Sequence, residues 1–251
     1  MKMTRRVQGV VRALVLLAPV AAFFALQSII GVTRSGTVEE IWFVRVEGAP
    51  RLVVRDRIAV GSERSFRWRD RLTLMDLATG ERLARSKVDA PLELMGESAE
   101  ALWFRRKDGS DVHARSPQTL ERLPLRAASP AAGGRAPADP AVQVATLPDG
   151  SRLAPPSPDS FFLGDASTGE AIVWGDPPSA LLVSPDAHGL LLTRVTGDGR
   201  TLWRAPLERQ RSIRGATRVG EVVVVITSGV ARDFAVAIDG RTGQTRWVQY
   251  F

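Results

Sequence analysis

The residue types that most often carry catalysis are scarce in this chain of 251 residues. It contains two histidines, His113 and His188, and no cysteine. Two histidines are too few for a three-histidine zinc site, and neither stands in an H-E-x-x-H spacing. The lack of cysteine excludes disulfides, thiol nucleophiles and cysteine-ligated zinc or iron–sulfur sites. We therefore expect both histidines to be surface or turn residues.

Two further patterns have the right residue types for chemistry but the wrong spacing. Ser184, Asp186 and His188 fall within one tight turn, where none can orient another for proton transfer. The Gly-Asp-Gly of residues 197–199 lacks the third glycine of a dinucleotide loop and the Gly-Lys of a phosphate loop. We therefore assign no catalytic, cofactor-binding or metal-binding residue.

Arginine and aromatic residues alternate in two places, FRWR at residues 66–69 and WFRR at residues 103–106. Such alternation can build cation–π ladders or a ligand surface. It is also what an ordinary strand shows when its arginines face water, and we favour this second interpretation.

Charge is distributed unevenly along the chain. The formal net charge is +7, and residues 1–36 contribute five basic residues and no acidic one, which leaves a surplus of two over the rest. That surplus is too small to indicate a nucleic-acid partner. With 44% hydrophobic and 24% charged residues, the chain has the composition of a globular protein with a sizeable core.

Residues 13–33 form an uncharged, largely apolar segment, ALVLLAPVAAFFALQSIIGVT. Its length matches the roughly 20 residues that span about 30 Å of hydrocarbon. Four basic residues precede it and one follows, an asymmetry that places the N-terminus in the cytoplasm. The alternatives are a cleaved signal peptide, which needs a shorter apolar region and a small-x-small site, and a buried core helix. The segment has no clean Ala-x-Ala site, so we favour a retained anchor.

This segment predicts two parts of the chain. Residues 1–36 are expected to be a basic cytoplasmic stub and a transmembrane signal-anchor that crosses the lipid bilayer with residues 13–33. Residues 37–251 are expected to be a single exported domain, in the periplasm or outside. The protein would then be a single-pass protein of the inner membrane.

The exported part reads as all-β. Short apolar runs rich in Val, Ile, Phe and Trp alternate with Gly, Pro, Asp and Ser, a pattern typical of antiparallel strands. We expect strands at residues 40–46, 52–55, 57–60, 71–76, 101–105, 161–164, 180–183, 189–195, 221–227 and 234–238. Residues 127–142 are Ala, Pro and Gly with almost no large apolar side chain, and we expect them to form a mobile loop.

A turn sequence recurs along this part of the chain. The complete copy, AIDGRTGQTRW, runs from Ala237 to Trp247 and contains Asp239, Thr242 and Gly243. Weaker copies contain Asp76, Thr79 and Gly80, then Thr119 and Leu120, then Asp165, Thr168 and Gly169 with Trp174, and finally Gly199 with Trp203. The turn positions 80, 120, 169, 199 and 243 recur close to the period of about 40–45 residues of a four-stranded propeller blade.

Each residue type in this turn has a local structural role. An Asp that ends a strand accepts hydrogen bonds from backbone N–H groups two residues on, and Thr adds a second local bond. Gly supplies the positive φ that lets the next strand return. A Trp on the returning strand can then wedge against the neighbouring sheet. The plainer alternative is that each copy is simply a good hairpin turn.

The segment from Ala237 to Trp247 resembles the tryptophan-docking motif of the quinoprotein-like (PQQ-repeat) β-propellers at every defining position. The turns LPDG at residues 147–150 and SPDA at 184–187 resemble turns of other bacterial propellers. The resemblance implies a β-propeller-like domain of about five four-stranded units, closed or incomplete. Enzymes of this family bind a quinone above a calcium ion, but this chain has no vicinal cysteines and no calcium-ligand cluster, so we expect the fold without the cofactor.

Three functions fit these expectations. The first is a noncatalytic binding or scaffold module of the bacterial cell envelope, with another envelope protein as its partner. The alternative is a quinone-linked oxidoreductase or a degenerate descendant of one. The third possibility is that the units do not close alone, so that the chain pairs through an open edge strand with another propeller or with itself.

Overall fold

The fold is known from a computed structural model that describes residues 37–62, 65–124, 139–230 and 232–251. The expected stub and membrane anchor (1–36) and most of the expected loop (127–138) lie outside the described residues. Within these ranges no helix is both long enough and apolar enough to span a bilayer. Every regular element they contain is a β-strand, which confirms the all-β expectation.

Three sheets are four-stranded antiparallel meanders in which the strands follow one another in sequence order. The first contains β1 (Thr37–Val46), β2 (Ala49–Ser62), β3 (Ser65–Asp76) and β4 (Arg82–Val88); the second contains β5 (Leu92–Glu97), β6 (Leu102–Arg106), β7 (Val112–Arg115) and β8 (Arg122–Leu123). The third contains β17 (Gln210–Val219), β18 (Val222–Gly229), β19 (Phe234–Asp239) and β20 (Thr245–Tyr250).

A fourth sheet has six strands in the order β16-β15-β14-β12-β9, with β13 also paired to β14. Its strands are β9 (Ala141–Val142), β12 (Phe161–Leu163), β13 (Val173–Gly175), β14 (Pro178–Asp186), β15 (Gly189–Thr196) and β16 (Thr201–Glu208). Two short strands, β10 (Ala145–Thr146) and β11 (Arg152–Leu153), pair by themselves. The described part therefore has three four-stranded sheets where about five were expected, and β9 gives the end of the expected loop regular structure.

The expected strands at residues 52–55 and 57–60 are one continuous strand, β2. Asp56 does not interrupt it, because its fully buried carboxylate is paired with the guanidinium of Arg71, directly opposite on β3. A buried charge that finds such a partner on the neighbouring strand is tolerated inside a sheet.

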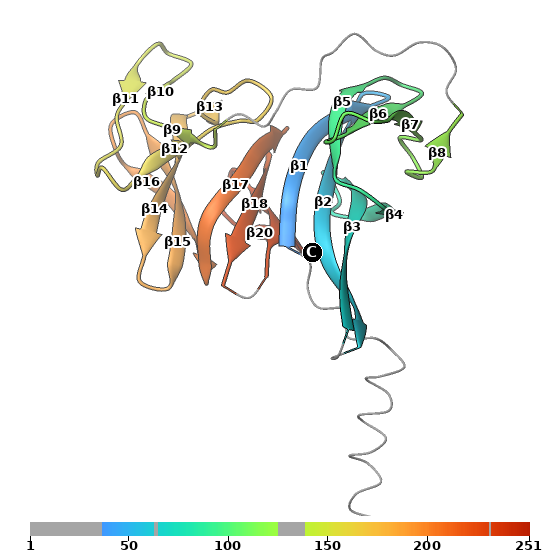
Figure 1. Cartoon of the computed structure of the whole chain (residues 1–251). Helices are drawn as coiled ribbons and strands as arrows, with labels where there is room; N and C mark the ends of the chain where they lie inside the picture. The colour runs from blue at the N-terminus through green and yellow to red at the C-terminus, as the bar shows by residue number, and fades with distance from the viewer. Residues whose placement is uncertain (1–36, 63–64, 125–138, 231) are drawn as a thin grey trace, which may run out of the picture.

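The sheets pack face to face in a row, as the blades of a propeller do (Figure 1). Separate apolar clusters join the fourth sheet to the third, the third to the first, and the first to the second. The sheet that contains β20 thus lies against the sheet that contains β1, although the two are far apart in sequence. The described residues form a β-propeller-like fold.

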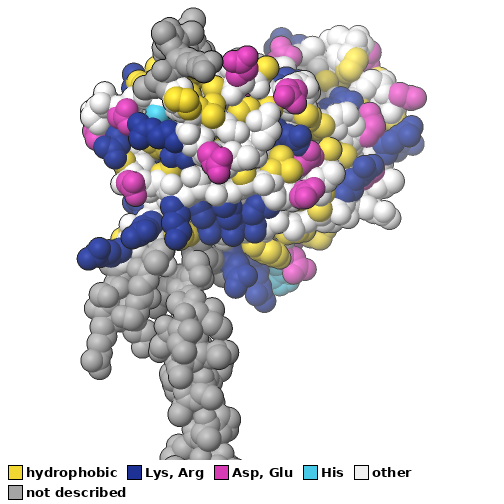
Figure 2. Space-filling model, turned by 90° about the vertical axis from the view of Figure 1, so that its right-hand side faces the viewer, with side chains coloured by type: hydrophobic (Ala, Val, Ile, Leu, Met, Phe, Trp, Pro, Cys, Tyr) yellow, Lys and Arg dark blue, Asp and Glu magenta, His cyan; other side chains and the backbone are white. Residues whose placement is uncertain are grey.

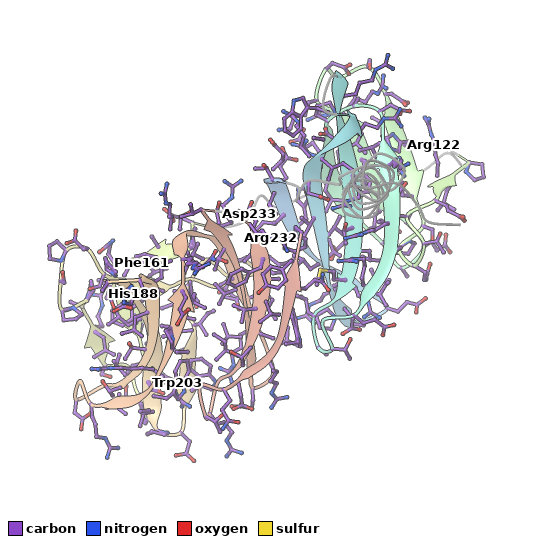
Figure 3. All side chains as sticks on the ribbon, turned by 90° about the horizontal axis from the view of Figure 1, so that it is seen from below. Arg122, Phe161, His188, Trp203, Arg232 and Asp233 are labelled. Atoms are coloured by element: carbon purple, nitrogen blue, oxygen red, sulfur yellow. The ribbon has the colours of Figure 1, made fainter. Side chains whose placement is uncertain are left out.

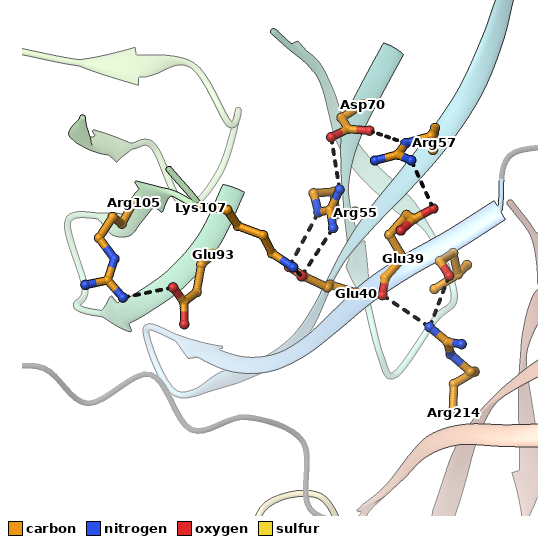
Figure 4. A network of polar contacts seen from close by, with 10 residues as sticks. Glu39, Glu40, Arg55, Arg57, Asp70, Glu93, Arg105, Lys107 and Arg214 are labelled. Carbon is orange, nitrogen blue, oxygen red and sulfur yellow. Dashed lines mark hydrogen bonds and ion pairs between the residues drawn. The ribbon is translucent and has the colours of Figure 1, made fainter. Parts of the chain in front are cut away.

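Polar contacts fasten β1 to its neighbours on both sides (Figure 4). Arg214 of β17 donates hydrogen bonds to the carbonyl oxygens of Val38 and Glu39, each at 3.2 Å. On the other side Lys107, which follows β6, forms an ion pair with Glu40. The first sheet is therefore linked to both the third and the second through β1, the strand at one edge of the sheet.

Candidate interaction surface

The repeated turns have closely similar geometry in the structure. In the copy at Asp239, the N–H groups of Arg241 and Thr242 donate to Asp239 Oδ1 at 2.9 and 3.0 Å. The N–H of Gly243 donates to the carbonyl of Asp239 at 2.8 Å, and Gly243 has a φ of 74°. Arg246 adds two bonds to Asp239 Oδ2 and lowers the pKa of this carboxyl to about 2.

The copy that starts at Asp76 repeats the bonds to backbone N–H groups, but Asp76 Oδ2 is paired with Arg51 of β2 instead of an arginine on the returning strand. Ala78 and Thr79 donate to Asp76 Oδ1 at 2.8 and 3.0 Å, and Gly80 donates to the Asp76 carbonyl at 2.9 Å. The glycine has the same φ of 74°. Two turns of the same geometry thus connect β3 to β4 in the first sheet and β19 to β20 in the third sheet.

The other copies depart from the pattern in instructive ways. Asp165 receives the N–H groups of Ser167 and, across to β17, of Arg218, each at 2.8 Å, so this turn also links two sheets. Thr168 Oγ1 accepts a hydrogen bond from the N–H of Glu170, and Gly169 has a φ of 77°. The turn at Gly199 is one residue shorter, because Gly199 bonds to the carbonyl of Thr196.

Tryptophans from one sheet dock on glycine turns of the next. A Cβ on Gly80 would lie 2.7 Å from Cγ of Trp247, and a Cβ on Gly243 would lie 2.7 Å from Cδ2 of Trp203. Each indole therefore occupies space that any other residue would need. Trp203 Nε1 also donates to the carbonyl of Gly240 at 2.7 Å, whereas Trp247 Nε1 has no partner among the described residues. Ala237, the first residue of the complete motif, is fully buried opposite Trp247.

At the interface of the first and second sheets, a different pair of residues takes the place of the tryptophan and the turn glycine. Ala84 stands on β4 four residues after Gly80, the position that Trp247 holds relative to Gly243. It packs against an apolar cluster that contains Leu120, which is fully buried and has a positive φ of 60°. Leu120 holds the glycine position of its turn, so a small residue on the strand is matched by a large one on the turn.

Trp174 docks on the same turn as Trp203, where a Cβ on Gly240 would lie 2.6 Å from its Cζ2, and its ring contacts two arginines. Its ring centroid is 4.7 Å from Cζ of Arg194 and 5.0 Å from Cζ of Arg218. Arg194 also donates to the carbonyl of Gly240 at 2.9 Å. Sequence reasoning missed both arginines, because they come from β15 and β17 and meet only when the sheets pack.

His113 is not at the surface, which corrects the expectation from the sequence. It is 4% exposed on β7, stacks on Phe104 and accepts a hydrogen bond from Arg115 Nε at 3.2 Å. Burial, followed by the charges of Arg115 and Arg122, lowers the pKa of His113 below 6.5. His188 does lie exposed in the turn between β14 and β15.

A groove of about 560 Å³ lies between the end of β16 and the face of β19 and β20. Its apolar wall contains Phe234, Val248 and Tyr250, and Tyr250 packs edge-on against Phe234 at 5.7 Å. Val248 is 42% and Tyr250 51% exposed, high values for large apolar side chains on a strand. Arg232, labelled in Figure 3, lies with its Cζ 5.9 Å from the ring of Tyr250.

The chemistry of the groove suits a polypeptide rather than a reaction. β20 is the outer strand of its sheet, so the backbone groups along its free side have no strand partner among the described residues. Arg209 and Arg232 give the rim positive charge against the single Glu208. Sequence reasoning missed this groove. The only signal was the placement of two apolar residues, Val248 and Tyr250, at alternate positions of the last strand.

The expectation of no cofactor and no metal remains a prediction. The described ranges contain no group of three or more His, Asp or Glu residues placed to hold a metal ion.

Comparisons with known proteins give little beyond this geometry. No protein-family model matches the chain, and no curated protein matches it. Among solved structures, the crystal structure of BamB from Moraxella catarrhalis is 13% identical, with 87% of this chain and 78% of that chain covered and a TM-score of 0.25. Hsv2p from Kluyveromyces lactis is 11% identical, with 80% and 75% covered and a TM-score of 0.23. Likenesses this weak carry no argument about function.

Proposed function

We propose that the chain is a noncatalytic binding module of the bacterial cell envelope. Residues 13–33 hold it in the inner membrane, and the folded domain on the exported side binds an extended segment of another envelope protein. The groove beside β20 is the observation that carries this proposal. It combines a free strand edge with exposed apolar side chains, which is the arrangement used when a peptide adds a strand to a sheet.

The charges of the groove indicate which kind of segment it takes. Arg209 and Arg232 at the rim outnumber Glu208, so acidic residues in the bound strand would be favoured at the ends of the groove. Val248 and Tyr250 offer contact to every second side chain of an added strand, because side chains alternate along it. The partner segment is therefore extended, apolar at alternate positions and acidic.

The test begins by identifying the partner in the source bacterium. A photo-crosslinking amino acid replaces Tyr250 in the full chain, and the same amino acid at Leu83 of β4 serves as control. Leu83 has a similar exposure of 39% on the outer strand of another sheet. The partner captured at position 250 but not at 83 is then purified, and its affinity is measured.

Val248→Asp and Tyr250→Asp should each weaken that affinity by roughly tenfold or more, as expected for buried anchors of an interface. Leu83→Asp should leave it unchanged. Equal weakening by all three variants would contradict the proposal.

The outcome that favours the alternative is specific. Stoichiometric binding of a quinone with Ca²⁺, accompanied by dye reduction, would identify a quinone-linked oxidoreductase. A chain that self-associates through β20 would lose its dimer on Tyr250→Asp and would replace the envelope partner by a second copy.

A further inference from the structure

The β2–β3 hairpin projects beyond the rest of the first sheet. β1 begins at Thr37, opposite Arg57, and β4 ends at Val88, opposite Asp70. Among the described residues, β2 and β3 alone continue past this level, as a two-stranded ribbon that ends with Ser62 opposite Ser65. Figure 1 shows this ribbon extending below the other strands. A two-stranded ribbon alone is marginally stable in water, so a surface that contacts it would stabilise it.

The side chains of this ribbon suit the boundary between lipid and water. Trp68 is 65% exposed, and its neighbours Arg67 and Arg69 are exposed with no ion-pair partner among the described residues. Tryptophan and arginine are the residue types that settle at a bilayer interface, where the ring enters the headgroup layer and guanidinium groups meet lipid phosphates. Figure 2 shows Lys and Arg side chains in a row across the lower part of one side of the molecule.

The length of the ribbon can be compared with the chain that leads to it. The expected membrane segment ends at Thr33, four residues before Thr37, and four residues reach at most about 14 Å. The ribbon extends five residues past the level of Thr37, about 17 Å, and Trp68 lies about 7 Å past that level. The ribbon extends from this level on the side where β1 begins, opposite to the direction in which β1 runs. An upright sheet therefore brings the ribbon to the bilayer surface.

We infer that the β2–β3 ribbon docks on the anionic lipid surface of the membrane, with Trp68 in the headgroup layer and Arg67 and Arg69 on lipid phosphates. The inference rests on the membrane anchor of the proposed function. It adds that the domain stands upright on the bilayer. The groove beside β20 is then presented at a fixed height and orientation to its partner.

The absence of cysteine makes the test direct, because one introduced cysteine is the only labelling site. The full chain is reconstituted into phosphatidylcholine vesicles with about one third phosphatidylglycerol and labelled with nitrobenzoxadiazole at Trp68→Cys. The matched control carries the label at Ala78→Cys, an exposed turn position at the opposite end of β3. The label at 68 should emit at shorter wavelength and be quenched by headgroup-level nitroxide lipids. The label at 78 should behave as in water.

A second pair of variants tests the role of charge. Arg67→Gln and Arg69→Gln should each lower the ratio of docked to undocked ribbon roughly fivefold, from about 1 kcal/mol per basic residue near an anionic surface. Arg200→Gln and Arg204→Gln, exposed positions on the fourth sheet, should have no effect. Pure phosphatidylcholine vesicles should lower the ratio for the chain with both arginines at least as much as either arginine substitution does.

Each contrary result has a distinct meaning. A chain that does not float with the vesicles overturns the membrane anchor and this inference together. A chain that floats while position 68 is as water-exposed as position 78 overturns the docked ribbon alone. Protection of position 68 that rises with the protein-to-lipid ratio would assign the ribbon to a second copy of the chain and would also overturn it.

Discussion

The indole ring of Trp247 lies on Gly80, so that β20 packs against the turn between β3 and β4. This contact joins the third sheet to the first and makes neighbours of segments that are distant in sequence. It requires glycine at position 80 for two reasons, the positive φ of 74° and the closeness of the ring. The two reasons can be separated experimentally.

Gly80→Ala should lower the free energy of unfolding by clearly more than the about 1–2 kcal/mol that a left-handed backbone conformation costs alone. The additional loss comes from displacement of the Trp247 ring. Gly109→Ala is the matched control, because Gly109 has a φ of 77° and nothing within 4 Å of its added Cβ. Urea unfolding measures both, and equal losses would mean that the ring does not lie on Gly80.

The two docking tryptophans should respond differently to loss of the indole N–H. Trp203→Phe removes the hydrogen bond to Gly240 and should cost about 1 kcal/mol more than Trp247→Phe, which removes a buried donor that has no partner in the described structure. Paired denaturant titrations of the two variants check this. The opposite order would show that Trp247 makes the stronger polar contact.

Ala84 is small where the other interfaces have tryptophan, and Leu120 is large where they have glycine. We therefore expect the effects of substituting these two residues on stability to be coupled. Ala84→Trp alone should overpack the interface of the first and second sheets. Leu120→Gly relieves the strain of the positive φ, which glycine adopts freely, but opens a cavity. The double variant should recover about 1 kcal/mol or more relative to the sum of the two losses, as a double-mutant cycle would report. Simple additivity would mean that the two side chains do not meet.

Stability should depend on pH through His113. Because its pKa is lowered in the folded chain, the unfolded chain takes up a proton near pH 6.5 while the folded one resists it. The free energy of unfolding should therefore fall as the pH is lowered from about 7, until His113 is also protonated in the folded chain. Protonation of Nε2 also breaks the bond from Arg115. Denaturant titrations between pH 7.5 and 5.5 measure the slope.

His113→Asn should remove most of this slope, at the cost of lower stability at every pH. His188→Asn is the control, since the slope due to His113 remains in that variant. A slope that persists unchanged in His113→Asn would assign the effect to other groups.

The local features of the fold could be predicted from the sequence. The turn at Asp239 depends on hydrogen bonds between residues at most five apart, and such bonds follow from residue type and spacing. Strands such as β2, β14 and β18 could be predicted because continuous runs of Val, Leu and Ile mark them in the sequence. The outer strand β4 escaped prediction because alternate side chains such as Arg85 and Lys87 face water, which leaves too few apolar residues to mark a strand.

The arrangement of the sheets and the groove could not be predicted in this way. Nothing local to Trp247 specifies that it meets Gly80 rather than another turn glycine. The burial of His113 likewise depends on Phe104 of the adjacent strand β6 and on the packing of the first sheet on the second. The groove forms only where the end of β16 meets the face of β20. These features depend on contacts between sheets. A repeat pattern in the sequence does not specify which sheet packs on which.

The packing of the third sheet on the first is tested most directly by a distance. Cysteines introduced at Ala78 and Val248 in the cysteine-free chain carry spin labels, and pulsed electron paramagnetic resonance measures their separation. Since packed sheets lie about 10 Å apart, a single narrow distance of about 20 Å or less is predicted. A broad distribution centred well beyond that distance would contradict the contact between Trp247 and Gly80 and the propeller-like row built on it.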